Sequence, residues 1–313
     1  MTAPTDCADV ACVLCVGQAT FDHVMFVPAA VTVGLKHAAA DYQVVGGGVA
    51  ANAAVAVSRL GGGSILASCV GDDPTGRLVL EGLADERVDT HFVRLVAATV
   101  TPFSTVVVSS DGARTVFNHT PAALFDRPCL PLDHRRINVV LTDCRWPAGT
   151  QAAVRYAHDN GVPCVVDVDR RITDPELRHM VFGLGTHLVF SEDALIDSTG
   201  CASSADGLRS IAQQTSAHVS VTLGGRGVQW LDGDEVESMD AFVVDVVDTS
   251  AAGDVFHGAF ALALAEGLDE AAGFRFASAA AALKCSRLGA RAGMPERPAV
   301  DELVARALTG TRR

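Results

Sequence analysis

The chain has 313 residues, of which 49% are hydrophobic, and carries a formal net charge of −13 at pH 7. This length and composition allow one large folded domain, or one domain with a small appendage. The acidic balance and the absence of long Lys/Arg runs argue against nucleic acid as a main partner. We find no signal-peptide pattern and no apolar stretch of membrane-spanning length, so we expect a cytoplasmic protein without a membrane partner.

Apolar strand-like runs alternate with amphipathic helices along the chain. The runs that we interpret as strands are VACVLCVG (10–17), SILASCV (64–70), INVVLTD (137–143), PCVVDVD (163–169), THLVFSE (186–192) and HVSVTLG (218–224). Nearly continuous apolar runs are typical of strands that are covered on both faces. Together with helices such as residues 149–160, they predict an α/β protein with a central, mostly parallel sheet flanked by helices.

Residues 21–45 and 98–118 interrupt this alternation. In the second region, the Asp111-Gly112 pair stands between alternating strand patterns and indicates a hairpin turn. We interpret both regions as strands of a small β lid. No repeat or low-complexity linker separates them from the rest, so we expect residues 1–313 to form a single domain in which the lid is inserted.

Cys12 and Cys15 form the only C-x-x-C pattern among the nine cysteines. They lie in a strand-like run, where residues three apart point to opposite faces of the sheet. A shared metal or redox site is therefore not expected, and a reducing cytoplasm fits the cysteine pattern.

The stretch YQVVGGGVAANAAVAVSRLGG (42–62) contains the G-x-G-x-x-A pattern of dinucleotide-binding turns at Gly46, Gly48 and Ala51. The strand before it is short and polar, however, and the apolar run at residues 10–17 is not followed by glycines. The structural context that this motif requires is missing, so we do not expect a dinucleotide-binding fold.

The stretch VVDVVDTSAAGDVFHGAFALALAEG (243–267) carries the strongest chemical signal. We expect a strand that ends at Asp248, a tight turn, and a helix that begins near Gly253. Backbone amides at a helix start favour an anion, and small side chains let a phosphate approach. Asp254 lies in the first turn, where an acidic side chain can also serve only to stabilise the helix. The amides concerned belong to Ala251, Ala252 and Gly253.

This stretch resembles the D-T-x-[GA]-A-G-D signature of the ribokinase-like (pfkB) carbohydrate kinases, and residues 46–62 resemble the N-terminal signature of that family. The resemblance covers essentially the whole chain. It implies a ribokinase-like fold with a β lid and an ATP-dependent transfer of phosphate to a sugar hydroxyl, with Asp254 as the general base. The turn from Ala251 to Asp254 would bind the transferred phosphate. Ala251 stands where many members have glycine, which is tolerable if its φ is negative.

The same resemblance assigns further residues. Sugar-binding positions are Asp22, Gly47, Gly48 and Asn52. The segment VTLGGRGV (221–228) is similar to the ATP loop, which implies nucleotide contacts by Thr222, Gly224, Gly225 and Gly227. ALKCSRLGARAGMP (282–295) is similar to the segment beside adenine and a monovalent-cation site, to which Asp248 and Ser250 would contribute as K⁺ ligands.

The family's N-x-x-E motif, which helps to organise Mg²⁺, should fall at FSEDAL (190–195). Ser191 replaces the Asn of the motif and Ala194 replaces its Glu. Glu192 is the candidate that compensates, and Mg²⁺-ATP remains the implied cofactor.

Lys36, Asn118 and Arg145 together resemble the sulfofructose kinase branch of the family, where cationic and amide groups meet a sulfonate. Arginine suits such an anion because its forked donors match tetrahedral oxygens. Each residue alone could equally be a surface or salt-bridging side chain. His257 lies on an apolar helix and is expected to be a hydrogen-bonded core residue.

Two alternatives keep the same fold. A nucleoside kinase would be favoured by an apolar, aromatic lid, whereas this lid reads as poor in aromatic residues. A non-catalytic sugar-binding regulator is suggested by the lost N-x-x-E motif, although the retained Asp254 argues against it. Because exposed β edges tend to pair, we expect a homodimer formed through the lid strands.

Overall fold

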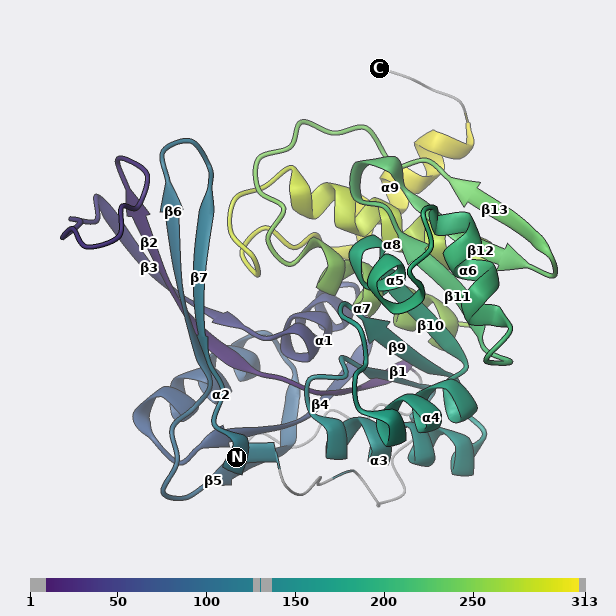
Figure 1. Ribbon diagram of the computed structural model, residues 1–313, viewed down its shortest axis with the longest axis horizontal. Helices are drawn as coiled ribbons and strands as arrows, with labels where there is room; N and C mark the ends of the chain where they lie inside the picture. The colour runs from purple at the N-terminus through teal and green to yellow at the C-terminus, as the bar shows by residue number, and fades with distance from the viewer. Residues whose placement is uncertain (1–9, 126–129, 131–136, 310–313) are drawn as a thin grey trace.

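The computed structural model describes residues 10–125, 130 and 137–309, and contains one large and one small β-sheet (Figure 1). The large sheet has nine strands in the order β13-β12-β11-β10-β9-β8-β1-β4-β5. All neighbours pair in parallel except β11 with β12 and β12 with β13. The strands are β1 (Cys12–Val16), β4 (Gly63–Gly71), β5 (Asp89–Val96), β8 (Val139–Thr142), β9 (Cys164–Val168), β10 (His187–Ser191), β11 (His218–Thr222), β12 (Val228–Asp232) and β13 (Glu235–Met239). The predicted mostly parallel sheet is confirmed.

Helices cover both faces of this sheet. One face packs against α1 (Val49–Arg59), α2 (Pro74–Asp85), α7 (Ala252–Ala265), α8 (Glu270–Cys285) and α9 (Arg297–Leu308). The other packs against α3 (Pro147–Asn160), α4 (Pro175–Leu184), α5 (Glu192–Thr199), α6 (Ser204–Ala212) and the short 3₁₀ helix Ala122–Phe125. Cys12 and Cys15 point to opposite sides, each into its own fully buried core, as the strand periodicity predicts.

Several helix starts follow directly from the sequence. Asp73, Asp174, Ser203 and Asp269 each precede a helix, and each side chain accepts a hydrogen bond from an amide of the first turn. Ser191 does the same for α5, because its Oγ accepts from the amide of Ala194 at 3.2 Å. The serine that replaces the Asn of the N-x-x-E motif is therefore a helix cap.

The small sheet has the order β3-β2-β6-β7 and rises beside the main body at the left of Figure 1. Its strands are β2 (Thr20–Val27), β3 (Asp41–Gly47), β6 (Phe103–Ser109) and β7 (Arg114–His119). They occupy the two regions predicted as lid strands, and the amide of Gly112 closes the predicted hairpin turn onto the carbonyl of Ser109. That residues 1–313 form a single domain stays a prediction.

The lid is richer in aromatic residues than expected. Phe21 and Phe103 pair across β2 and β6, with His119 beside Phe103 on β7. Tyr42 and Phe117 lie on the same face and are exposed by 50% and 62%. Asp22 follows Phe21 directly, and successive strand residues point to opposite faces. The aromatic rings therefore lie on the face opposite Asp22.

The expected strand that ends at Asp248 is absent. Residues 240–248 contain no strand, and the side chains of Val243, Val246 and Val247 are exposed by 99%, 65% and 58%. The sheet ends at β13, so no strand edge is paired with this segment. Instead, the amides of Val247 and Asp248 donate to the carbonyl of Cys285 at the end of α8, at 2.8 and 3.1 Å. Among the described residues, no helix combines the length and apolar character needed to cross a membrane.

Candidate active site

Asp254 is the point at which the two signature segments meet. It lies in the first turn of α7, and its Oδ2 accepts a hydrogen bond of 2.8 Å from Nδ2 of Asn52 on α1. The helices approach closely because Gly258 of α7 lies against the backbone of Ala53, where a Cβ would come within 2.5 Å of the carbonyl oxygen. Residues far apart in the sequence are thereby joined at one site.

A second hydrogen-bonded partner fixes how Asn52 is oriented. Arg291, which is 8% exposed, donates from Nε to Oδ1 of Asn52 at 2.9 Å and from Nη2 to the carbonyl of Gly47 at 3.0 Å. Because the amide oxygen of Asn52 accepts from a guanidinium, its nitrogen must face Asp254. Arg291 thus connects lid strand β3 to the orientation of the aspartate, a role that the sequence analysis did not assign.

The glycine run serves two purposes. Gly48 has φ +93 as the residue before α1, and a Cβ there would lie 2.4 Å from the carbonyl oxygen of Gln18. Gly46 and Gly47 instead leave room for charged side chains: a Cβ on Gly46 would lie 2.0 Å from Nη1 of Arg291, and one on Gly47 would lie 2.1 Å from Oδ2 of Asp22. The run therefore seats charged groups beside the start of α1.

Asp22 lies on β2 at the base of the lid. Its Oδ1 accepts from Oγ1 of Thr20 at 3.0 Å, and Ser104 hydrogen-bonds to it as well. Burial raises the pKa of Asp22 above its ordinary value, although these hydrogen bonds and Arg291 oppose the rise. Asp22, Ser104 and Asn118 are register partners across β2, β6 and β7, so their side chains share one face of the lid.

Burial raises the pKa of Asp254 to about 7. The hydrogen bond from Asn52 and the charge of His257 lower it, whereas the carboxylates of Asp167 and Asp143 raise it. The carboxyl group is nevertheless partly accessible to solvent. A carboxylate with a pKa near neutrality can accept a proton from a substrate and release it again at physiological pH.

His257 is buried, as predicted, but it is not fully hydrogen-bonded. Nδ1 lies 3.1 Å from Oδ2 of Asp167, within ion-pair distance, while neither ring nitrogen has an aligned hydrogen bond. Burial alone would lower the pKa of His257, but the carboxylate of Asp167 outweighs this effect and raises it. The expectation of a satisfied core histidine is therefore wrong.

The turn before α7 differs from expectation in its backbone. Ala251 has φ +59, so the condition of a negative φ is not met, and the residue adopts the left-handed conformation that favours glycine. The amide of Ala252 makes a long bond of 3.3 Å to the carbonyl of Thr249. Beside Gly253 there is open space, because a Cβ there would meet no heavy atom within 4 Å. An anion can therefore approach the first amides of α7.

The oxygens of Asp248, one of the two predicted K⁺ ligands, already have hydrogen-bond partners within the protein. Lys284, which is fully buried, donates from Nζ to the carbonyl oxygen of Asp248 at 2.8 Å and to its Oδ2 at 3.2 Å. Ser250 donates to Oδ1 of Asp248 from both its amide and its hydroxyl. The K⁺ site therefore stays a prediction, and Lys284 competes with a bound ion for the oxygens of Asp248.

The predicted nucleotide residues follow β11. Oγ1 of Thr222 donates to the carbonyl of Phe190 at 3.3 Å, and the 3₁₀ helix Gly224–Arg226 comes next. A Cβ on Gly224 or Gly225 would meet no atom within 4 Å, so open space lies beside both. Gly227 has φ +93 and is packed against the carbonyl of Met239, which is a structural requirement.

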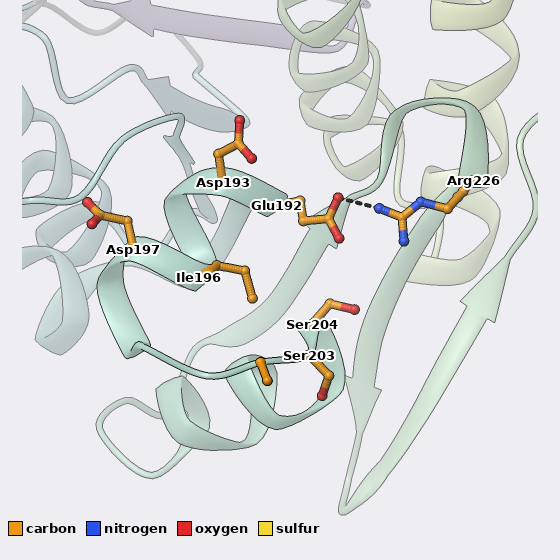
Figure 2. A pocket seen from close by; sticks show the side chains of 8 residues that line it. Glu192, Asp193, Ile196, Asp197, Ser203, Ser204 and Arg226 are labelled. Atoms are coloured by element: carbon orange, nitrogen blue, oxygen red, sulfur yellow. Dashed lines mark hydrogen bonds and ion pairs between the residues drawn. The ribbon is translucent and has the colours of Figure 1, made fainter.

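Glu192 forms an ion pair with Arg226 (Figure 2). The two residues lie at the rim of a pocket between α5, α6 and the 3₁₀ helix, with Ser203 and Ser204 on the opposite side. The carboxylate therefore neutralises the arginine beside the predicted nucleotide loop. That Glu192 contributes to nucleotide binding stays a prediction.

Of the three residues predicted to bind an anion, Lys36 lies apart from the active site. Lys36 is exposed in the loop between β2 and β3, at the end of the lid remote from Asp22. Asn118 lies on β7 in line with Asp22. Arg145 follows β8 and pairs with Asp169, while its Nε is buried without a hydrogen-bond partner.

Comparison with known proteins identifies the family. The model of the pfkB family carbohydrate kinases matches residues 11–297. The chain belongs to the pfkB family of carbohydrate kinases.

Individual pfkB relatives agree with this. The chain is 29% identical to the ribokinase of Bacillus subtilis, over 84% of this chain and 89% of that protein. It is 27% identical to fructokinase-1 of Zea mays, over 90% of this chain and 95% of that protein. A crystal structure from Agrobacterium tumefaciens, provisionally described as a ribokinase, is 33% identical with a TM-score of 0.89 and covers 97% of this chain and 100% of its own. The structure of the Arabidopsis thaliana ribokinase, solved with ribose and ATP, is 25% identical with a TM-score of 0.83. It covers 94% of this chain and 98% of its own.

The sequence analysis missed three residues that lie at or beside the site: Asp143, Asp169 and Arg291. Asp143 is the last residue of the predicted run INVVLTD, and Asp169 is the last residue of PCVVDVD. Each directly follows an observed strand, and ligand sites in such sheets lie at the carboxyl ends of the strands. That signal was available. Asp143 accepts from the amides of Gln18 and Ala50 at 2.7 and 3.2 Å, which ties β8 to α1. No comparable signal pointed to Arg291, because its partners lie more than two hundred residues earlier in the chain.

Proposed function

We propose that this pfkB kinase transfers the γ-phosphate of ATP to a hydroxyl group of a small sugar, with Asp254 as the general base. The observation that carries this proposal is the environment of Asp254. The carboxylate stands in the first turn of α7, is held by Asn52, has a pKa of about 7 and adjoins the open space at Gly253. A base of this pKa beside helix amides suits a reaction in which a hydroxyl attacks a phosphate.

In this mechanism, the sugar lies between the lid and the start of α1, where Asp22 and Asn118 offer polar groups on one face of the lid. Asp254 accepts the proton of the attacking hydroxyl as the new oxygen–phosphorus bond forms and the bond to the β-phosphate oxygen breaks. The amides at the start of α7 stabilise the negative charge of the transferred group. Arg291 keeps Asn52, and through it Asp254, in the required orientation.

ATP as the donor is supported by the Arabidopsis ribokinase structure with ribose and ATP, and in this chain by the open space beside Gly224 and Gly225. ATP use and the free cysteines among the described residues agree with a cytoplasmic protein.

Mg²⁺ suits the two carboxylates at the carboxyl end of β9. Oδ1 of Asp167 and Oδ1 of Asp169 are both buried without a hydrogen-bond partner, and Mg²⁺ prefers such oxygen ligands. These two residues, directly or through water, would hold the ion, which would neutralise charge on the phosphates. Glu192 is engaged by Arg226, so it does not supply the missing Glu of the N-x-x-E motif in this arrangement.

The sugar itself is a finer proposal. A neutral pentose or ketohexose is the first candidate, because ribokinases and fructokinases are both among the relatives. A 6-deoxy-6-sulfofructose substrate is the second, and two features favour it: the buried, unpaired Nε of Arg145 and the position of Asn118 in line with Asp22. The distant Lys36 and the carboxylate of Asp169, which competes for Arg145, weigh against it.

The remaining alternatives receive less support. The aromatic residues of the lid would favour a nucleoside if they faced the sugar site, but they lie on the face opposite Asp22. The intact contact between Asn52 and Asp254 argues against a non-catalytic regulator.

The lid also supports a homodimer. Tyr42, Val44 and Phe117 are exposed on its outer face, and β3 and β7 both have a free edge among the described residues. A second copy of this lid would cover these groups. Sedimentation of the wild type and of Phe117→Glu tests this: we expect a dimer that the substitution weakens, whereas a wild-type monomer would contradict it.

A screen for ADP release tests the activity. With Mg²⁺-ATP, the protein should release ADP with at least one of ribose, fructose, other ketohexoses or 6-deoxy-6-sulfofructose. Sugar binding without ADP release across the panel would support the regulator, and a preference for adenosine would support the nucleoside kinase.

Arg145→Ala distinguishes the two sugar classes. If the substrate is anionic, the loss of a charge-assisted pair should raise KM by roughly one to two orders of magnitude for the sulfosugar and leave a neutral ketohexose almost unaffected. Arg226→Ala is the matched control. This arginine is also paired with a carboxylate, but it borders the pocket between α5 and α6. Equal losses on both sugars would show that Arg145 only supports the structure.

A further inference from the structure

Two histidines and a glutamate gather at the edge of the sheet opposite the active site. His187 and His218 are the first residues of β10 and β11 and are register partners. Their rings stack, with centroids 4.9 Å apart and planes inclined by 12°. Nε2 of His187 lies 3.4 Å from Oε1 of Glu270, the first residue of α8, and Nε2 of His218 lies 3.5 Å from the same oxygen.

Hydrogen bonding around His187 indicates where the ring proton can lie. Oγ1 of Thr186 accepts from the amide of Cys164 at 2.7 Å and donates to the carbonyl of Cys164 at 3.1 Å. A hydroxyl group has only one hydrogen to donate. Nδ1 of His187 lies 2.8 Å from the same Oγ1, so it can donate to that oxygen while the hydroxyl hydrogen serves the carbonyl of Cys164.

The other nitrogen of His187 then faces an acceptor. His187 is buried, and a neutral ring with its proton on Nδ1 has a bare lone pair at Nε2. In this tautomer the lone pair of Nε2 and Oε1 of Glu270 lie 3.4 Å apart, an arrangement that suits a cation between them, whereas in the other tautomer Nε2 donates to Glu270.

We propose that His187, His218 and Glu270 bind a divalent transition-metal ion of the Zn²⁺ class. Their ligand atoms all lie within 4.8 Å of one another. Tetrahedral Zn²⁺ with bonds of about 2.0 to 2.1 Å requires ligand atoms about 3.4 Å apart, and both contacts to Glu270 match this spacing. Because the two rings are stacked, the exposed ring of His218 has to turn so that its Nε2 lone pair faces the ion. Two imidazoles and one carboxylate are typical ligands of such ions.

The surroundings complete the site. Thr186 orients the ring of His187 through Nδ1, which is the usual arrangement for a histidine ligand. The side chain of His218 is 58% exposed, so an ion can enter from solvent and a water molecule can take the fourth position.

This site is separate from the catalytic one. His187 and His218 begin β10 and β11, whereas Ser191 and Thr222 end them on the active-site edge. A strand of five residues separates its ends by about 13 Å. A bound ion would fasten the start of α8 to the sheet, so its expected effect is on stability and not on the chemical step.

Metal titration tests the proposal. The protein, stripped with a chelator, is titrated with Zn²⁺ by calorimetry and heated with and without Zn²⁺. We expect one binding site for Zn²⁺. His218→Ala and Glu270→Gln should each lower the Zn²⁺ affinity at least about tenfold, the lower end of the range for substitutions around a metal site. A higher melting temperature with Zn²⁺ should accompany wild-type binding and be lost in both variants. His218 is exposed, so its replacement should not impair folding.

His179→Ala serves as the matched control, because His179 is an exposed histidine on α4 away from the cluster. It should bind Zn²⁺ like the wild type. Binding of Co²⁺ should give the intense visible absorption of a tetrahedral site in wild type and control only. Equal Zn²⁺ affinity in wild type and His218→Ala, or no binding by the wild type, would overturn the proposal.

Discussion

Asp248 and Asp254 flank the same turn, yet their surroundings give them opposite properties. Asp254 accepts one side-chain hydrogen bond, from Asn52, and burial raises its pKa to about 7. Burial would also raise the pKa of Asp248, but hydrogen bonds from Ser250 and the ammonium of Lys284 outweigh it and lower the pKa to about 2. Asp248 receives further hydrogen bonds from Arg114 and Gly289. The number of hydrogen-bond donors around a buried carboxylate thus decides whether it stays ionised as a counter-ion or can act as a base.

The two aspartates also affect stability in opposite directions. The pKa of Asp248 is lower in the folded chain than in the unfolded one, so it stabilises the fold above about pH 4, and this contribution is lost as the pH falls towards 2. The pKa of Asp254 is raised, so it costs stability progressively as the pH rises from about 4 to about 7. The proposed catalytic group therefore destabilises the fold at the pH at which it works.

Removing the base should have the largest effect. Asp254→Asn keeps the shape and the contact with Asn52 but cannot accept a proton, so turnover should fall by roughly two to four orders of magnitude. ADP-release kinetics measure the loss, and ATP binding and melting temperature serve as controls for folding. Near-normal turnover would remove Asp254 from the mechanism.

Removing the counter-ion should mainly affect stability. Lys284→Met leaves Asp248 without its buried cation and should cost about 3 to 5 kcal/mol of unfolding free energy. Denaturant titration measures this. Because the ammonium already engages two oxygens of Asp248, wild-type turnover should be the same in K⁺ and in tetramethylammonium, while K⁺ should partly restore Lys284→Met. Strong activation of the wild type by K⁺ would contradict this assignment.

Arg291→Met should shift the pH dependence of the reaction. It removes a positive charge near Asp254 and frees the amide of Asn52, and both changes favour the protonated carboxyl group. We expect the acidic limb of kcat/KM to move up by about one pH unit, with activity recovering near about pH 9.

Arg59→Met is the matched control for Arg291→Met. Arg59 donates to the carbonyl of Met294 in the same loop at 3.1 Å, but it makes no contact with Asn52. It should leave the pH profile unchanged. A uniform loss of activity at every pH in Arg291→Met would show a purely structural role.

The smallest effect concerns the turn between the two aspartates. Ala251 has φ +59, so Ala251→Gly should relieve backbone strain and add about 0.5 to 1 kcal/mol of stability. Thermal unfolding measures the gain. A loss of stability would mean that the greater freedom of glycine in the unfolded chain outweighs the relief of strain.

The fold could be predicted from local patterns because the buried parallel strands are apolar on both faces, and β1 and β8 to β11 lie within the predicted runs. Relying on apolar runs also produced one error, the expected strand that ends at Asp248. Its valines look like a strand, yet no neighbouring edge pairs with them. An apolar run specifies a strand only where another strand is available.

The site could be predicted in part. The signatures led to Asp254 and Asn52, which do meet. Lys284 and Arg291 could not be found in this way, since their roles depend on contacts with segments distant in sequence. The positive φ of Ala251 was also hidden, because an alanine gives no sign of a left-handed conformation.

The most direct test of the central claim is the pH profile of wild-type kcat/KM. Asp254 faces the carboxylates of Asp143 and Asp167, the ring of His257 and the guanidinium of Arg291, and the balance of burial and these charges sets its pKa at about 7. Since kcat/KM reports ionisations of the free enzyme, activity should fall tenfold per pH unit below about pH 7, and this limb should disappear from the residual activity of Asp254→Asn. A limb near about pH 4, the ordinary range of an aspartate, would contradict the account.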